Sequence, residues 1–182
     1  MSDILAQYGR VTIYNEPNHP SPIYHVEGTI EANPYGDLAA LLEDDSLEEV
    51  MYNGGTQCVK VAHRDHGMCR TNVWIDDNDG LQIATNIASF TNVPLGDGPG
   101  MVPIFDGRLQ DGSRVNGTIP PVSPDGPTLT IRKFKEDPLT MIDLINFGTV
   151  NLRLAAMMWV WIEGLDARPA NFVIAGGTGS GK

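Results

Sequence analysis

The sequence ends in a short apolar run followed by a glycine-rich loop, and this order constrains the fold more than any other feature. The run Asn171-Phe172-Val173-Ile174-Ala175 is rich in strand formers, and residues 176–182 follow the pattern G-x-x-x-x-G-K. In this pattern the glycines let successive backbone N–H groups turn toward phosphate oxygens, and the lysine reaches the β- and γ-phosphates. The sequence therefore predicts a buried strand that leads into a phosphate-binding loop.

The loop residues predicted to bind a nucleotide are Gly176, Gly177, Thr178, Gly179, Ser180, Gly181 and Lys182. The pattern calls next for a Ser or Thr that binds Mg²⁺ and for a helix whose N-terminus faces the phosphates. Because both would follow Lys182, we expect the chain to be the first part of a longer protein. We expect these 182 residues to bind ATP weakly or not at all and not to hydrolyse it.

The charge of the chain is strongly negative, with 12 Lys and Arg against 23 Asp and Glu. This balance argues against nucleic acid or an anionic membrane surface as a direct partner. Residues 1–50 hold 10 of the acids and one base, so an acidic face could engage a basic partner or could simply be solvated. The two cysteines suggest no disulfide framework and favour a reducing cytoplasm. The longest apolar run, residues 154–162, has nine residues and is too short to span a bilayer.

The patterning up to residue 135 predicts an α+β module with a mostly antiparallel sheet covered by helices on one face. Ile23–Val26 is a possible strand, and residues 37–49 suit a short helix that runs into an acidic turn. Asp79 is a plausible N-cap for a helix that ends near Asn92. Strands are predicted at residues 49–52, 58–63, 71–75, 101–109, 113–119 and 127–134.

Two helices follow this module. Asp137 and Pro138 resemble an N-cap and first helical residue, with Gly148 ending that helix. Thr149 is the predicted cap of the next helix, whose apolar surface from Leu152 to Ile162 is wide enough to be nearly buried. The expected organisation is an N-terminal extension (1–35), an α/β domain (36–135), a linker helix (136–148) and the start of an α/β phosphate-loop domain (149–182).

Three arginines stand on neighbouring predicted strands, namely Arg108, Arg114 and Arg132. Period-two alternation puts Arg114 on one face with Asn116 and Thr118, and Arg132 with Thr128 and Thr130. One guanidinium group can donate hydrogen bonds to two phosphate oxygens at once, and its charge stabilises the negative charge that develops on a transferred phosphoryl group. The sequence thus offers them as catalytic residues, with surface arginines that solvate the sheet as the alternative.

Cys58, His63, His66 and Cys69 have the spacing C-x₄-H-x₂-H-x₂-C, and all four residue types bind zinc. Two of these ligands would have to come from strand interiors whose side chains point across the sheet. We therefore favour packed thiols with turn and strand histidines, and assign no metal ligand.

The arginine block, residues 115–121 and 126–134, followed some forty residues later by the phosphate loop, resembles the secretion-ATPase superfamily of type II and type IV secretion, type IV pili and archaella. Asn53-Gly54 and residues 63–72 are most similar to the archaellum motor ATPase and archaeal pilus ATPases. The resemblance covers residues 45–182. It implies a PAS-like N-terminal module hinged near residues 135–149 to a RecA-like core.

That resemblance carries further expectations. Arg114 and Arg132, with Arg108 as a weaker third, would contact phosphates, and Lys182 would be the loop lysine, with ATP and Mg²⁺ as cofactors of the whole protein. The whole protein would be a homohexamer that works in the cytoplasm at the inner face of the cell membrane, with a polytopic platform protein and accessory motor proteins as partners. Two alternatives stay open: a docking module that uses its acidic N-terminus, and an unrelated phosphate-loop enzyme.

Overall fold

The computed structural model describes residues 3–30, 33–134 and 139–177. The chain forms two compact units, Met1–Phe134 and Lys135–Lys182, which we describe separately. In the first unit the described residues form the strands β1 (Asp3–Tyr8), β2 (Val11–Asn15), β3 (Ile23–Val26), β4 (Leu47–Asn53), β5 (Lys60–His63), β6 (Gly67–Thr71), β7 (Ile104–Arg108), β8 (Arg114–Thr118) and β9 (Thr128–Arg132). Its helices are η1 (Gly36–Leu38), α1 (Ala39–Leu42) and α2 (Asp77–Phe90).

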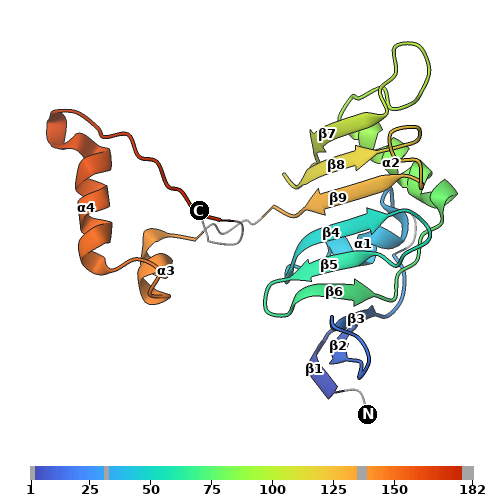
Figure 1. The fold of residues 1–182 in the computed structure, drawn as a ribbon, viewed down its shortest axis with the longest axis horizontal. Coiled ribbons are helices and arrows are strands. Elements are labelled where there is room, and N and C mark those ends of the chain that lie inside the picture. The colour runs from blue at the N-terminus through green and yellow to red at the C-terminus, as the bar shows by residue number, and fades with distance from the viewer. Residues whose placement is uncertain (1–2, 31–32, 135–138, 178–182) are drawn as a thin grey trace. The chain divides into compact units, whose positions relative to one another are not determined.

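The nine strands of the described residues form one sheet in the order β1-β2-β3-β6-β5-β4-β9-β8-β7 (Figure 1). Every pairing is antiparallel except that of β3 with β6, which is parallel and joins Ile23 to Arg70 and Tyr24 to Thr71. The mixed α+β class with a mostly antiparallel sheet is therefore as predicted. Strands β1–β3 belong to the same sheet as the rest of the unit.

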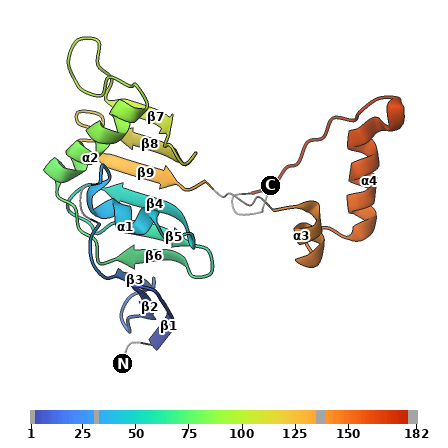
Figure 2. The ribbon, with the colours of Figure 1, turned by 180° about the vertical axis from the view of Figure 1, so that it is seen from behind.

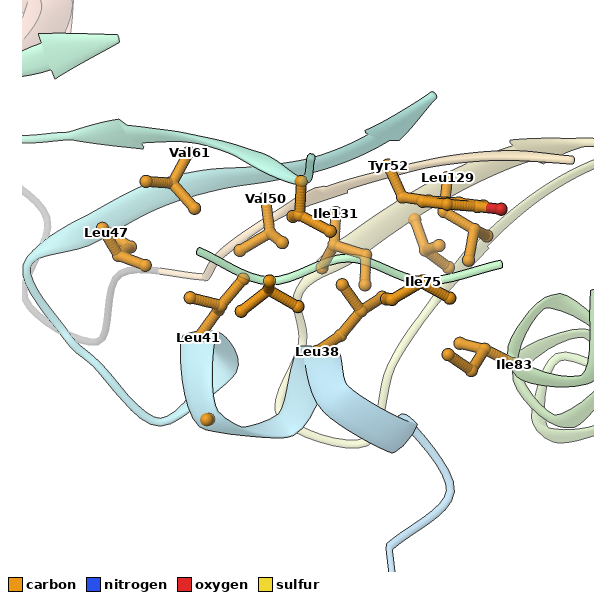
Figure 3. Packing of buried hydrophobic residues seen from close by; sticks show 14 of the residues in the cluster. Leu38, Leu41, Leu47, Val50, Tyr52, Val61, Ile75, Ile83, Leu129 and Ile131 are labelled. Carbon is orange, nitrogen blue, oxygen red and sulfur yellow. The ribbon is translucent and has the colours of Figure 1, made fainter. Parts of the chain in front are cut away.

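One face of the sheet is covered by α1 and α2 (Figures 1 and 2). Leu38 and Leu41 point from η1 and α1 toward Val50 and Ile131 of the sheet, and Ile83 of α2 joins the same core (Figure 3). These side chains are at most 5% exposed, and full burial of such a side chain stabilises a fold by about 1.5–3 kcal/mol. The sheet residues that alternate with them point to the opposite face.

Several element boundaries differ from those predicted. The strand predicted at 71–75 was wrong except at Thr71: β6 covers Gly67–Thr71, because β5 and β6 form a tight hairpin in which His63 pairs with Gly67. The predicted cap of α2 was wrong: Asp76 accepts hydrogen bonds from the backbone N–H groups of Asn78 and Asp79. β1 was not predicted, because an edge strand with exposed side chains carries little hydrophobic pattern.

The second unit contains α3 (Met141–Asn146), α4 (Leu152–Glu163) and the short helix η2 (Gly164–Asp166). Thr140 caps α3 in a capping box with Asp143, so that helix begins later than predicted; Asp137 and Pro138 lie outside the described residues. Asn151, not Thr149, caps α4 by accepting from the N–H of Leu154. Gly164 ends α4 as predicted, in a left-handed conformation with φ 74° that glycine adopts without strain.

Two predictions for the second unit were wrong. The apolar surface of α4 is not buried: Leu152, Trp159 and Ile162 are 72%, 68% and 56% exposed, and Ala155 alone of the helix is buried. Residues 171–175 form no strand, since no other strand of the described unit offers backbone groups to pair with them. Within this segment the ring of Phe172 lies 5.7 Å from that of Trp161 of α4, whereas Val173 and Ile174 are exposed.

Candidate functional site

The three arginines singled out in the sequence occupy one cross-strand row of the sheet. Arg108 of β7 is the register partner of Arg114 of β8, and Arg114 is the register partner of Arg132 of β9. Side chains directly opposite each other on neighbouring strands have Cβ atoms about 4.5–5.5 Å apart. All three are exposed on the face opposite to α1 and α2. We call Arg108, Arg114 and Arg132 the arginine row.

The next rows on this face are polar. Asn116 pairs with Thr130, and Thr118 pairs with Thr128, whose hydroxyl oxygen lies 2.7 Å from that of Thr118. The Asn116 side-chain amide donates to the backbone carbonyl of Phe105 across β7 and β8. The arginine row therefore lies beside hydroxyl and amide groups on these strands, as period-two alternation predicted for Arg114 and Arg132.

The guanidinium groups of the arginine row make no direct contact with an acidic side chain of the described residues, although Glu49 and Asp106 stand on neighbouring positions of the same face. Among the described residues, no hydrogen bond or ion pair reaches the guanidinium group of Arg108, Arg114 or Arg132. Glu49 of β4 is the register partner of Arg132 on its other side, yet the two make no ion pair within 4.0 Å. Like charges placed directly opposite each other destabilise a sheet, so this row favours a role beyond folding and suits an anionic ligand.

The end of β9 beside Arg132 is anchored from the other face of the sheet. The Nζ of Lys133 donates a 2.6 Å hydrogen bond to the backbone carbonyl of Asp44, and its side chain is 9% exposed. Burial lowers the pKa of Lys133, while the nearby carboxylates of Asp45 and Asp44 act in the opposite direction. The backbone that carries Arg132 is thereby tied to the turn between α1 and β4.

The glycine-rich loop is only partly described. Gly176 and Gly177 are exposed and lie outside regular secondary structure, whereas Thr178, Gly179, Ser180, Gly181 and Lys182 lie outside the described residues. The loop belongs to the second unit and the arginine row to the first.

The four residues with zinc-like spacing do not gather into a metal site. No group of three or more His, Cys, Asp or Glu side chains in the described part of the chain could hold a metal ion. Both ring nitrogens of His63 are already engaged, Nδ1 by the backbone N–H groups of Asp65 and His66 and Nε2 by the Tyr8 hydroxyl. Cys58 and Cys69 are buried free thiols, and burial raises the pKa of Cys69.

An open pocket of about 570 Å³, lined by polar and apolar residues alike, was not predicted. It lies between the turn after β4, the start of α2 and the loop between β8 and β9, with Asn53, Asp77 and Asp125 in its wall. The Asp77 carboxylate accepts from the N–H of Gly55 at 2.7 Å and from the Tyr52 hydroxyl at 3.3 Å. Asp77 thus docks the start of α2 on the sheet, a role that its sequence position did not signal.

Part of the acidic excess in residues 1–50 has internal partners. Glu43 forms a 2.6 Å ion pair with Arg10, and Asp44 accepts hydrogen bonds from Tyr8, Tyr24 and Ser46. These acids are less available to a basic partner than the sequence suggested. No helix among the described residues is both long and apolar enough to cross a membrane.

Comparisons with known proteins give relatives from Methanocaldococcus jannaschii. The chain is 51% identical over 148 residues to the uncharacterized protein MJ0781, a match that covers 81% of this chain and 20% of that protein. It is 36% identical over 149 residues to the uncharacterized protein MJ0900, covering 81% of this chain and 26% of that protein. The chain thus spans about a fifth to a quarter of these relatives. No protein-family model matches it.

A solved structure with a similar fold is the VirB11 ATPase from the Brucella suis type IV secretion system in complex with sulphate. The TM-score is 0.51 with 20% sequence identity, and the similarity covers 71% of this chain and 40% of that protein. The chain therefore shares its fold with part of a type IV secretion ATPase.

Proposed function

We propose that this chain is the N-terminal part of a hexameric secretion or motor ATPase, in which the arginine row contacts the phosphates of bound ATP. The observation that carries the proposal is the register of Arg108, Arg114 and Arg132, whose exposed guanidinium groups stand side by side without an ion pair in a chain of net charge −11. The fold shared with VirB11 and the phosphate-loop pattern at residues 176–182 support it.

The chemistry of the arginine row fits a triphosphate. Guanidinium is planar, permanently charged and able to bond two phosphate oxygens at once. A row of such groups would offset charge that develops on the γ-phosphoryl group during transfer, and its hydroxyl and amide neighbours would fill remaining oxygen contacts. Arg114 and Arg132 are the principal candidates and Arg108 the third. Mg²⁺ would accompany the phosphates, and we assign no residue of the described chain to it.

In the proposed mechanism, the loop of residues 176–182 would bind the nucleotide of the whole hexamer as part of a RecA-like core. The arginine row of the PAS-like module would contact nucleotide phosphates and would release them after hydrolysis, so that the state of the nucleotide drives the motion. The exposed apolar surface of α4, which includes Trp159 and Ile162, would pack against the remainder of that core.

The motion would serve assembly or rotation of an archaellum, a pilus or a secretion filament. In this proposal the hexamer works in the cytoplasm, at the inner face of the cell membrane, against a polytopic platform protein and accessory motor proteins. The alternative is an acidic docking module. It has less support, because Glu43 and Asp44 already form an ion pair and hydrogen bonds within the first unit.

The test is ATP hydrolysis by the full-length hexamer with single substitutions in the arginine row. Arg114→Ala and Arg132→Ala should each lower kcat by roughly 10³, since arginines that stabilise a phosphoryl-transfer transition state contribute on this scale. Arg108→Ala should lower it less. Arg70→Ala is the matched control, because Arg70 is a β6 arginine whose guanidinium faces His19 outside the row. Turnover within about twofold of the unsubstituted enzyme for both Arg114→Ala and Arg132→Ala would refute the assignment.

A further inference from the structure

A hydrogen-bonded cluster fastens the N-terminal strand to the rest of the first unit. The hydroxyl of Tyr8, at the end of β1, lies 2.9 Å from Oδ2 of Asp44, 2.7 Å from Oγ of Ser46 and 3.1 Å from Nε2 of His63. The Tyr24 hydroxyl also donates to Asp44 Oδ2, at 2.5 Å. We call Tyr8, Tyr24, Asp44, Ser46 and His63 the His63 network.

The hydrogen bonds around His63 determine where its proton lies. Nδ1 accepts from the backbone N–H of Asp65 at 3.0 Å and from that of His66 at 3.3 Å. An atom that accepts two N–H groups carries no hydrogen, so the neutral ring holds its proton on Nε2. Nε2 then donates to the Tyr8 oxygen, and the Tyr8 hydroxyl donates to Asp44. The three groups form one directed chain from imidazole to carboxylate.

A second proton on His63 is incompatible with this arrangement. It would have to bind Nδ1, where it would face the two N–H donors of the turn that links β5 and β6. The ring would have to leave the turn or rotate, and either movement breaks the bond from Nε2 to Tyr8. Protonation of His63 is thus coupled by geometry to loss of the Tyr8 contact.

The surroundings of His63 agree with this conclusion. The ring is 4% exposed and lies among Tyr8 and Tyr24, with ring centroids 6.4 and 6.5 Å away, and His66, at 4.8 Å. Burial lowers the pKa of His63, and the charges of His66 and Arg64 lower it further. The carboxylates of Asp44 and Asp65 oppose these effects without reversing them.

Once Tyr8 is released, β1 is held by its backbone pairing with β2 and by Ala6, which packs against the core. It is an edge strand, its side chains are almost all exposed, and its pairing with β2 is interrupted by an irregularity between Ile4 and Ala6. Within the described part of the chain, all side-chain hydrogen bonds of β1 are made by Tyr8. By contrast β2 buries Val11 and Ile13 in the core.

We propose that β1 is a pH-sensitive strap: protonation of His63 undocks Tyr8 and loosens β1 from β2, while β2 stays in the sheet. Loosening β1 exposes the outer backbone edge of β2. The strap is independent of nucleotide and of the arginine row, so it stands or falls apart from the proposed ATPase function.

Amide hydrogen exchange of the intact chain tests this strap. We compare residues 4–8 with residues 11–15 at about pH 7.5 and about pH 5, on either side of the ordinary histidine pKa, after correction for intrinsic exchange. Exchange in β1 should become several-fold to about tenfold faster at the lower pH, because the strap then lacks the hydrogen bonds of Tyr8. Within β2, the amides that bond to β3 should change little, whereas those that bond to β1 should lose protection together with β1.

Three variants make the result specific to His63. His63→Gln retains an N–H donor for Tyr8 but cannot titrate, so its β1 should exchange slowly at both pH values. Tyr8→Phe should exchange fast at both. His66→Gln is the matched control, a histidine in the same turn; its β1 should still respond to pH, at a midpoint raised by the loss of the His66 charge. NMR of the imidazole nitrogens should show Nδ1 unprotonated at neutral pH and report the His63 pKa directly.

Two outcomes would overturn the proposal. One is equal protection of β1 at both pH values in the unsubstituted chain while the nitrogen spectra show that His63 has become protonated. The other is a pH response that persists in His63→Gln and disappears in His66→Gln. If His63→Gln fails to fold, the nitrogen titration and the exchange of β1 in the unsubstituted chain still show whether β1 loosens when His63 is protonated.

Discussion

The Tyr24 hydroxyl donates a 2.5 Å hydrogen bond to Oδ2 of Asp44, and this contact connects β3 to the turn between α1 and β4. Tyr24 is fully buried, and Oδ1 of Asp44 accepts from the backbone N–H and the hydroxyl of Ser46. Burial, together with the hydrogen bond to Asp44, raises the pKa of Tyr24 far above the ordinary value. The buried hydroxyl therefore depends on this carboxylate as its acceptor.

Asp44→Ala should destabilise the chain by about 3 kcal/mol, because it leaves a buried tyrosine hydroxyl without its acceptor and removes charged hydrogen bonds. Urea unfolding measures the change. Asp45→Ala is the control: its side chain is fully exposed and lies 3.9 Å from Lys133, so we expect a loss of less than about 0.5 kcal/mol. Equal losses for the two variants would show that the Asp44 hydrogen bonds contribute nothing particular to stability.

Acid should unfold the chain partly through Asp44. Burial alone would raise the pKa of Asp44, but hydrogen bonds from Ser46, Tyr24 and Tyr8 outweigh it and leave the pKa below the usual 3.8. A carboxyl whose pKa is lower in the folded state stabilises the fold above its unfolded pKa, and this contribution disappears as the pH falls through the folded pKa. Urea unfolding from about pH 6 down to about pH 3 should therefore show stability falling with acid, and Asp44→Asn should flatten the steepest part of that fall. An unchanged slope in Asp44→Asn would contradict this prediction.

The N-cap of α2 is Asp76, whereas the sequence alone favoured Asp79. Asp76 Oδ1 accepts from the N–H groups of Asn78 and Asp79 at 2.8 and 2.9 Å. Asp76→Ala should cost about 1 kcal/mol, within the range for loss of an N-cap, whereas Asp79→Ala should cost only the weak charge interaction with the helix dipole. Thermal unfolding of both variants checks the order, and a larger loss for Asp79→Ala would reverse the assignment.

Gly80 should reverse the usual effect of alanine in a helix. In an exposed helix Gly→Ala stabilises by about 1 kcal/mol. Here a Cβ at Gly80 would lie 2.4 Å from the Tyr52 hydroxyl oxygen and 2.5–2.6 Å from ring carbons, so Tyr52 or α2 would have to move. Gly80→Ala should therefore destabilise by about 1–3 kcal/mol in urea unfolding.

Gly98→Ala is the control for this substitution, since its nearest contact would be the Met101 sulfur at an ordinary 3.5 Å. It should change stability by less than about 0.5 kcal/mol. Stabilisation by Gly80→Ala would show that Tyr52 does not pack against α2 as closely as described.

The amino-acid sequence determined the local features of this protein. Alternation of apolar and polar residues identified most of the strands, and it assigned Arg114 and Arg132 to faces shared with threonines and asparagine. The glycine at position 164 specified the end of α4, because few other residues accept its backbone conformation. These features depend on a few neighbouring residues, so the sequence contains all the information that they require.

Tertiary structure decided what depends on residues far apart in the chain. The alignment of Arg108, Arg114 and Arg132 follows from the register between strands, which no single strand specifies. The role of Asp44 arises because Tyr8, Tyr24 and Lys133 approach it from three separate segments. The exposure of α4 likewise depends on what packs against it. An apolar stripe in the sequence predicts a surface that can be buried, but it does not specify the partner that buries it.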